Sequence, residues 1–335
     1  MLLGALLVLA ACGKPGDSPS ASKRKVTIGI QVSPAMTLLM VAKDAGLFEK
    51  QGLDVDLKQF TAGKFALQAF LGGSIDFAVS GDVPVCLAIL QGNSMKVVAQ
   101  VVEKTINEVR VVALKPQDSA VAADPHAYFT ARQRKLATSL GGGPEFFTYK
   151  FLKHNNIPPN QVQIISQRPE DMPAALETRS LDAISIFDPF AFIAEQRLGS
   201  RAITFREPAI YSELYLLTAR QQQVDNQGDT ITAVLKALVD AQDFILANGA
   251  RAKQIMQSYT KLEAPVVDGI WDNFSFKPAL GPSLLEYWNQ ETAWAKDTGV
   301  ISPNSKTPDF RTVLEPRFLE AVSPSGVSIA AAVRQ

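Results

Sequence analysis

Short apolar segments alternate with amphipathic ones over residues 26–218. The segment IDFAVS (75–80) is short, β-branched and aromatic, which predicts a strand buried on both faces. It stops at Gly-Asp-Val-Pro, and the chain then becomes apolar again at once. Asp82 followed by Pro84 is a helix-start signature, because an acidic residue caps a helix and proline already has a helical φ. The stretch therefore predicts a strand, a tight turn and a helix.

The same order of signals occurs twice in the chain. GGSIDFA (72–78) has an echo in TRSLDAI (178–184), and in both cases a second acid, Asp82 or Asp188, comes six residues after the aspartate. Upstream of each echo, the pattern of strand, polar loop and helix is also repeated. Each half therefore reads β-α-β-α-β, which predicts a parallel sheet covered by helices. The predicted fold class is α/β, with two Rossmann-like lobes, each a mostly parallel sheet, and a ligand cleft between them.

The turns that follow the strands form the predicted working face of each lobe. Ligands of open α/β sheets sit outside the carboxyl ends of the strands, where the helix N-termini also point. These turns are rich in Gly, Ser, Thr and Pro, which allows close approach of the backbone. The candidate ligand-binding residues lie in or beside them: Ser33, Met36, Thr61, Gly63, Lys64, Gly81, Asp82, Ser139, Gly141, Gly142, Gly143, Arg168, Phe187 and Asp188.

The stretch SLGGGPE (139–145) is the sharpest of these signals. Three glycines before a helix leave amide N–H groups that suit an anion or a carbonyl oxygen, although a flexible turn is the alternative. Glu145 adds negative charge at the same helix end, so its side chain either points away or binds an amine of the ligand. Lys64 and Arg168 could bind a sulfonate, carboxylate or phosphate, or could lie on the solvated surface.

Other candidates have simpler alternatives beside their functional interpretation. Asp82 and Asp188 are most simply helix caps, although a cap can face a ligand too. Ser33 and Thr61 are possible hydroxyl donors. Phe187 could wall a pocket, because ligand sites are mostly apolar with few polar anchors, whereas core packing is the usual role of a phenylalanine.

Composition narrows the function classes. The 335-residue chain has 33 basic and 33 acidic residues, so without a basic excess we expect no nucleic-acid partner. No internal run reaches the roughly 20 apolar residues needed to span a bilayer. The two cysteines and two histidines have no metal-ligand spacing, and neither a GxGxxG motif nor a P-loop occurs. We therefore expect no metal and no cofactor.

The N-terminus, MLLGALLVLAACGK, predicts export. Residues 2–9 form a short apolar segment that ends in small residues, like the h-region of a secretory signal. LAAC (9–12) resembles the lipobox of bacterial lipoproteins, so residues 1–12 are the expected lipoprotein signal and Cys12 the lipidated residue; a chance apolar N-terminus with a buried cysteine is the alternative. Residues 13–25, rich in Gly, Pro and Ser, predict a flexible tether. The expected location is the bacterial cell envelope, on the periplasmic or extracytoplasmic face. The lipid on Cys12 would anchor the protein to the membrane.

Four stretches carry a resemblance to a known family: AKDAGLFEKQGLDVDL (42–57), ALQAFLGGSIDFAVSGDVP (66–84), FLKHNNIPPNQVQII (151–165) and AALETRSLDAISIFDPF (174–190). They resemble the substrate-binding proteins of ABC importers, in the group that takes nitrate, sulfonate, taurine and thiamine precursors. The GLFEKQGLDV and GGSIDFAVSGDVP parts are the most specific. The resemblance covers roughly residues 26–218, and the helical remainder fits in character only.

This resemblance implies the fold of a type II periplasmic binding protein, whose two lobes are joined by two crossings and close on ligand like a hinge. The crossings are expected near residues 109–113 and 203–217. The expected layout is lobe 1 at 26–112, lobe 2 at 113–204, and a return to lobe 1 with C-terminal helices at 205–335. The family also implies a small-molecule solute, permease and ATPase subunits as partners, and a monomer.

The function expected first is capture of a small organic anion or zwitterion, such as a sulfonate or taurine, and its delivery to the permease. A thiamine-precursor pyrimidine or another small aromatic solute is the alternative ligand. Desulfinases that resemble this family use a cysteine nucleophile in a cleft loop, whereas here the turn after the first strand has Ser33, and Cys86 lies inside a predicted helix. Pyrimidine synthases of this fold carry a cysteine-rich motif that this sequence lacks. We therefore expect that the protein is not an enzyme. A regulator or adhesin built on a binding lobe is the third class of function that the sequence leaves open.

Overall fold

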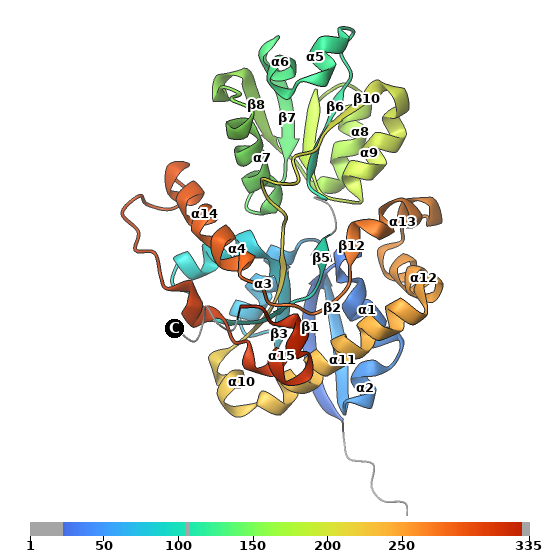
Figure 1. Cartoon of the computed structure of the whole chain (residues 1–335), viewed down its shortest axis with the longest axis vertical. Coiled ribbons are helices and arrows are strands. Elements are labelled where there is room, and N and C mark those ends of the chain that lie inside the picture. The colour runs from blue at the N-terminus through green and yellow to red at the C-terminus, as the bar shows by residue number, and fades with distance from the viewer. Residues whose placement is uncertain (1–22, 105–107, 330–335) are drawn as a thin grey trace, which may run out of the picture.

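A computed structural model of the chain describes residues 23–104 and 108–329. They form two lobes, one above the other in Figure 1, each built on a five-stranded sheet. In lobe 1 the strand order is β2 (Leu53–Phe60), β1 (Arg24–Gln31), β3 (Phe77–Gly81), β11 (Tyr215–Ala219) and β4 (Lys96–Gln100). In lobe 2 it is β10 (Ala202–Phe205), β6 (Arg110–Leu114), β9 (Ala183–Ile186), β7 (Arg134–Thr138) and β8 (Val162–Ser166). A small sheet pairs β5 (Glu103–Lys104) with β12 (Phe274–Ser275).

The two five-stranded sheets have equivalent topologies. In lobe 1, β1 pairs in parallel with β2 and β3, and β11 runs antiparallel between β3 and β4. In lobe 2, β7 pairs in parallel with β8 and β9, and β6 runs antiparallel between β9 and β10. In each sheet the antiparallel strand is the first that the chain adds after it crosses from the other lobe. The two-lobed α/β fold is therefore confirmed, and each sheet is mixed, with one reversed strand.

Helices cover both sheets. Lobe 1 has α1 (Thr37–Asp44), α2 (Leu47–Lys50), α3 (Gly63–Leu71) and α4 (Asp82–Leu90), and lobe 2 has α5 (Ser119–Ala123), α6 (Pro125–Thr130), α7 (Gly143–His154), α8 (Met172–Glu177) and α9 (Phe190–Leu198). The C-terminal part forms α10 (Gln221–Asn226), α11 (Gly228–Ala247), α12 (Gly249–Thr260), α13 (Ala264–Ile270), α14 (Ser283–Asp297) and α15 (Arg317–Val322). Among the residues described, no helix has the length and apolarity that crossing a membrane would require.

The buried strands pack on both of their faces, as their continuous apolar sequences predict. All five residues of β3 are buried. In lobe 2, Val111 and Leu136 belong to the apolar cluster on one face of the sheet, while the next residues, Val112 and Ala137, belong to the cluster on the other face. This alternation follows from the two-residue period of a strand, and it leaves only the strand ends free to build a site.

The turn at Gly81 differs in detail from the prediction. Helix α4 begins with Asp82 itself, and Gly81 is the N-cap. The Asp82 carboxylate still accepts a hydrogen bond from the Val83 amide, with 3.0 Å between oxygen and nitrogen. The expected order of strand, turn and helix is present, with the helix starting one residue earlier than a cap at Asp82 implies.

The chain crosses between the lobes twice. The first connection runs from the end of β4 at Gln100 to the start of β6 at Arg110, and the second from Phe205 to Tyr215. The first crossing therefore lies before most of the expected 109–113 segment. Because β6 pairs with β9 and β10, its residues already belong to the sheet of lobe 2, and a boundary after Val112 would cut through this strand.

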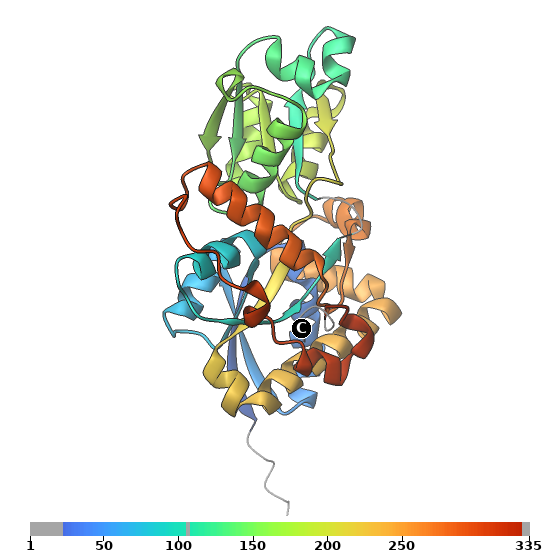
Figure 2. The ribbon, with the colours of Figure 1, turned by 60° about the vertical axis from the view of Figure 1, so that its left-hand side comes forward.

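The C-terminal segment returns to lobe 1, but α14 contacts both lobes. Trp288 belongs to the apolar cluster of lobe 1, whereas Trp294, two turns later, packs with Phe146 in the cluster of lobe 2. The Tyr149 hydroxyl of α7 also donates to Asp297. Figure 2 shows α14 lying across the junction of the lobes. The segment from residue 205 is thus not a return to lobe 1 alone.

Candidate functional site

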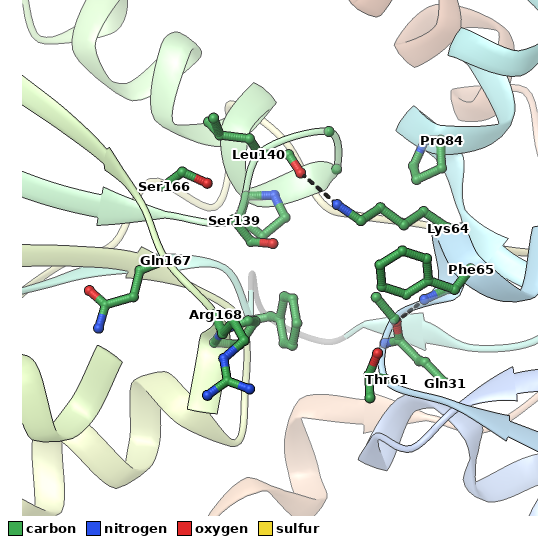
Figure 3. Close-up of a pocket in the computed structure, with 18 of the residues that line it drawn as sticks. Gln31, Thr61, Lys64, Phe65, Pro84, Ser139, Leu140, Ser166, Gln167 and Arg168 are labelled. Atoms are coloured by element: carbon green, nitrogen blue, oxygen red, sulfur yellow. Dashed lines mark hydrogen bonds between the residues drawn. The ribbon is translucent and has the colours of Figure 1, made fainter. Parts of the chain in front are cut away.

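A cleft of about 390 Å³ lies between the two lobes. Lobe 1 lines it with the end of β1, the β2–α3 turn and the start of α4, and lobe 2 with the turns after β7, β8 and β9. Figure 3 shows these side chains entering from both sides. The lining residues are Gln31, Thr61, Ala62, Gly63, Lys64, Phe65, Gly81, Pro84, Ser139, Leu140, Gly141, Gly142, Pro144, Ser166, Gln167, Arg168, Pro169, Glu170, Phe187 and Glu213. The turns predicted as the working face therefore meet in one cavity.

Many of the predicted site residues line this cleft. From lobe 1 and lobe 2 they are Thr61, Gly63, Lys64, Gly81, Ser139, Gly141, Gly142, Arg168 and Phe187. Each lies at the carboxyl end of a strand or in the turn or helix start that follows it, which is why a local strand-turn-helix pattern was enough to find it. Their contact with a ligand stays a prediction.

Lys64 joins the two lobes directly. Its Nζ atom donates to the main-chain carbonyl of Leu140, 3.2 Å away on the facing turn of lobe 2 (Figure 3). The same ammonium group lies 5.4 Å from the ring centre of Phe65. The lobes are thus in contact at the cavity wall, and Lys64 would have to release Leu140 for the cleft to open at this point.

Gln31 organises the lobe 1 side of the cleft. Its side-chain carbonyl accepts from the Gly63 amide at 3.0 Å, and its amide group donates to the Ser33 hydroxyl at 2.9 Å and the Tyr215 hydroxyl at 3.1 Å. This network holds the β2–α3 turn against the end of β1. Gln31 was not among the predicted binding residues, although it ends the first strand, and its position at a strand end was the signal available.

One main-chain amide of the glycine-rich turn of lobe 2 already has a hydrogen-bond partner within the protein. Gly141 has φ +76°, a conformation that glycine adopts without strain, and its amide donates to a Glu145 carboxylate oxygen at 2.6 Å. Glu145 therefore folds back onto the turn that it follows. One of the amides expected to bind an anion is already used, which answers the question that Glu145 raised in the sequence.

Arg168 lies at the rim of the cleft and already has acidic partners. Its side chain is 74% exposed, and one guanidinium nitrogen lies 2.9 Å from Asp171. A second nitrogen lies 3.6 Å from Glu170. Solvent weakens such exposed pairs, so Arg168 could exchange them for a ligand, but its positive charge is largely balanced where it stands.

Glu213 is a cleft residue that no signal in the sequence revealed. It lies on the second connection between the lobes and is 5% exposed, yet it lines the cavity. Its carboxyl group sits between a glycine of each lobe: an added Cβ would lie 2.7 Å from Oε1 at Gly81 and 2.6 Å at Gly143. The Tyr215 hydroxyl donates to Oε2 at 3.4 Å. Since the crossing has no strand-turn-helix pattern, no local signal marked this residue.

Three predicted residues are displaced from the cleft by packing. Met36 is fully buried in the core of lobe 1, because it lies in the short 3₁₀ turn (Pro34–Met36) that leads into α1. Ser33 is 4% exposed and holds the Gln31 side chain. Gly143 faces the Glu213 carboxyl group and the Tyr211 hydroxyl, which leave no space for a side chain. The prediction that these three line the cavity is wrong.

The two predicted acids are also buried away from the cleft. Asp82 accepts from the Tyr211 hydroxyl at 2.6 Å. Asp188 is 1% exposed and pairs with Arg110 at 2.8 Å, while Asn273 of the C-terminal segment donates to its second oxygen, also at 2.8 Å. Burial alone would lower the pKa of Arg110, but its bonds to acidic partners raise that pKa above the ordinary value. Each carboxylate therefore binds a side chain from a distant segment of the chain, and neither one lines the cavity.

Cys86 is not placed for nucleophilic chemistry. It is fully buried in α4, and burial raises the pKa of its thiol well above the usual value. The reactive form of a cysteine is the thiolate, which this environment disfavours. Over residues 23–104 and 108–329, no group of three or more His, Cys, Asp or Glu side chains is arranged to hold a metal ion. Cys12 lies outside the described residues.

Comparison with known proteins agrees with this architecture. A model of the NMT1-like family matches residues 20–258, which is most of the chain. The chain belongs to the NMT1-like family. A Bacillus subtilis (strain 168) protein, provisionally named as an aliphatic sulfonates-binding protein, is similar to this NMT1-like protein: 24% of 279 aligned residues are identical, and the alignment covers 82% of this chain and 81% of the relative.

Two solved structures resemble this NMT1-like protein in fold. The periplasmic aliphatic sulphonate binding protein SsuA from Escherichia coli has a TM-score of 0.72 at 20% identity, covering 85% of this chain and 90% of that one. The periplasmic nitrate-binding protein NrtA from Synechocystis PCC 6803 has a TM-score of 0.69 at 15% identity, covering 93% and 91%. At these identities the likeness establishes the fold, which is that of periplasmic binding proteins.

Proposed function

We propose that this NMT1-like protein is the solute-binding component of an ABC importer, which captures a small organic anion or zwitterion of the sulfonate or taurine type. The observation that carries the proposal is the cavity of about 390 Å³ lined by strand-end turns of both lobes. Pockets of this size suit small molecules, and a site shared by two lobes can bury a ligand when they close. The sulfonate- and nitrate-binding relatives support a solute that carries an oxyanion.

Capture needs only binding and closure. The solute enters while the lobes are apart, contacts both sets of turns, and stabilises the closed state by its preference for it. The Lys64 contact with Leu140 adds a bond that exists only when the lobes are close. Release follows when docking on the permease favours the open state. No step forms a covalent bond, and we propose that the protein is not an enzyme, since Cys86 is buried and its thiolate is disfavoured.

The cell envelope is the proposed place of action. Relatives described as periplasmic support an extracytoplasmic location. We extend this to a lipid anchor on Cys12, on the strength of the LAAC sequence at residues 9–12. The protein would then act as a tethered monomer beside its permease and ATPase. The names of the relatives favour this function over a pyrimidine solute or a desulfinase.

A thermal-shift screen of the full chain tests the proposal. Its panel contains alkanesulfonates, taurine, carboxylates, nitrate and pyrimidines. A ligand that binds only the folded state at 100 times its Kd adds about 2.7 kcal/mol of stability, which raises Tm by roughly 4 °C for a chain of this size. A panel in which nothing raises Tm would contradict the proposal. A rise with nitrate alone would refute the organic solute.

A matched pair of variants locates the binding. Gly142 has an extended backbone, and a Cβ there would meet only Pro144 at 3.8 Å, so Gly142→Leu fills the cleft without backbone strain. Gly249 begins α12 away from the cleft and has open space, so Gly249→Leu is the control. We expect Gly142→Leu to abolish the ligand-induced shift and Gly249→Leu to retain it. A shift that survives Gly142→Leu would place the ligand elsewhere.

A further inference from the structure

Lobe 2 meets the C-terminal segment at a second place besides α14. Helix α9 of lobe 2 contacts α13. The ring of Phe192, on α9, lies so close to Gly269 of α13 that an added Cβ there would stand only 2.2 Å from the ring atom Cζ. This ring packs against the apolar cluster of lobe 1, although its helix belongs to lobe 2. The contact therefore joins the two lobes directly.

The glycine at this contact is explained by the ring. Glycine is one of the poorest helix formers, yet Gly269 lies inside α13. Any larger residue at this position would collide with the Phe192 ring as it now lies. The loss of helix stability is thus accompanied by a close approach of α9 to α13.

Asp188 holds the same contact in place. One of its carboxylate oxygens accepts from the Phe192 amide at 3.2 Å, and the other accepts from the Asn273 side chain at 2.8 Å. Directly after Asn273 the chain forms β12, which pairs with β5 on the first crossing between the lobes. We call Asp188, Phe192, Gly269 and Asn273 the joint. The joint therefore lies beside a connection about which the lobes can bend.

The contact of α14 with lobe 2 is packed less closely. Cavities of about 600 Å³ and 560 Å³ lie beside it, and each is lined by residues of both α7 and α14. A closely packed interface resists displacement, whereas helices with space beside their contact can slide past each other. Figure 1 shows α13 and α14 on opposite sides of the connections between the lobes. One side of this junction is therefore tightly seated and the other has room to move.

We propose that the joint is the pivot on which lobe 2 turns against lobe 1, while α7 slides along α14. The Phe192 ring, seated against Gly269, sets the angle between the lobes in the ligand-free protein. The same angle sets the width of the cleft at the contact between Lys64 and Leu140. The four residues of the joint do not line the cleft, so they act on its width from outside. The pivot would work in the same way whichever solute the cleft binds.

Gly269→Ala tests the pivot, because the ring would have to withdraw until the new Cβ, 2.2 Å away, reaches an ordinary separation of 3.4 Å or more. Spin labels on Lys58→Cys and Gln163→Cys, exposed positions on the edge strands β2 and β8, measure the distance between the lobes by double electron–electron resonance. Cys12→Ser prevents labelling at that position, and Cys86 is buried.

We expect Gly269→Ala to shift the mean distance in the ligand-free full chain by at least about 2 Å, since a small displacement at a hinge grows with distance from it. In a Phe192→Ala background the collision is absent, so Gly269→Ala should cause no further shift. Gly228→Ala is the matched control. Its Cβ would lie 2.9 Å from the Phe318 ring, but this contact joins α11 to α15 within lobe 1, so the distance should stay unchanged.

Three results would overturn the pivot. One is an unchanged distance in Gly269→Ala with a native circular dichroism spectrum. Another is a shift that persists in the Phe192→Ala background, and the third is an equal shift in Gly228→Ala. If Gly269→Ala fails to fold, Phe192→Ala decides by itself. Loss of the ring should broaden the distance distribution, and a distribution identical to that of the wild type would refute the proposal.

Discussion

Replacing Glu291 by glutamine should change how the stability of the protein depends on pH. Glu291 lies on α14 and is completely buried beside Asp82, Cys86 and Glu213. Among the described residues, its carboxyl oxygens make no well-formed hydrogen bond, and the polar groups that interact with it are the Cys86 thiol and the Asp82 carboxyl group. Burial, followed by the negative charge of Asp82, raises the pKa of Glu291 well above the usual value. The folded protein therefore holds a proton on this side chain at a pH where the unfolded chain has lost it.

The sign and size of the effect follow from proton linkage. Above pH 4.5, the ordinary pKa of Glu291, the folded state binds more protons than the unfolded state, so stability falls as pH rises until the folded pKa is reached. The slope for one group is at most about 1.4 kcal/mol per pH unit. For a chain of this size that corresponds to roughly 2 °C in Tm per pH unit. Glutamine is uncharged at every pH, so Glu291→Gln removes this loss.

Thermal unfolding from pH 5 to pH 8.5 measures the difference. We expect Glu291→Gln to be more stable than the wild type at pH 8.5, with a gap that narrows toward pH 5. Glu286→Gln, on the exposed face of the same helix, should run parallel to the wild type. If the wild type and Glu291→Gln also ran parallel, or if the variant were less stable at pH 8.5, then Glu291 would be ionised in the folded protein and the reasoning would be refuted.

Three further changes test the packing around the cleft. Arg110→Met leaves the Asp188 carboxylate buried without its cation and should cost about 3–5 kcal/mol in urea unfolding; a loss below 1 kcal/mol would contradict a buried ion pair. Gly143→Ala forces a Cβ to within 2.6 Å of Glu213 and should cost about 1–3 kcal/mol, so unchanged stability would mean that the carboxyl group moves freely. Lys64→Met removes a bond worth about 0.5–1.5 kcal/mol between the lobes and should increase the radius of gyration of the ligand-free protein in small-angle X-ray scattering, whereas an identical scattering curve would show that this bond does not hold the lobes together.

The predicted residues reach the cleft where their position follows from local structure. Thr61, Ser139 and Phe187 each come directly after a strand, and all three line the cleft. The prediction failed where a polar residue has a distant partner. The sequence around Asp188 is that of a helix cap at a strand end. In the structure its carboxylate forms a buried ion pair with Arg110, which is far away in the sequence. A strand-turn-helix pattern contains no information about such a partner.

The amino-acid sequence by itself determined the order of strands and helices, the duplication of the lobe and the turns that form the working face. These properties depend on periodicity and on turn chemistry, which act over a few residues. Only the tertiary structure decided which turn residues reach the cleft and that Glu213 adds a carboxyl group to its lining. It also decided that α14 packs on both lobes. Those properties depend on long-range packing between segments whose spacing along the chain says nothing about their distance in space.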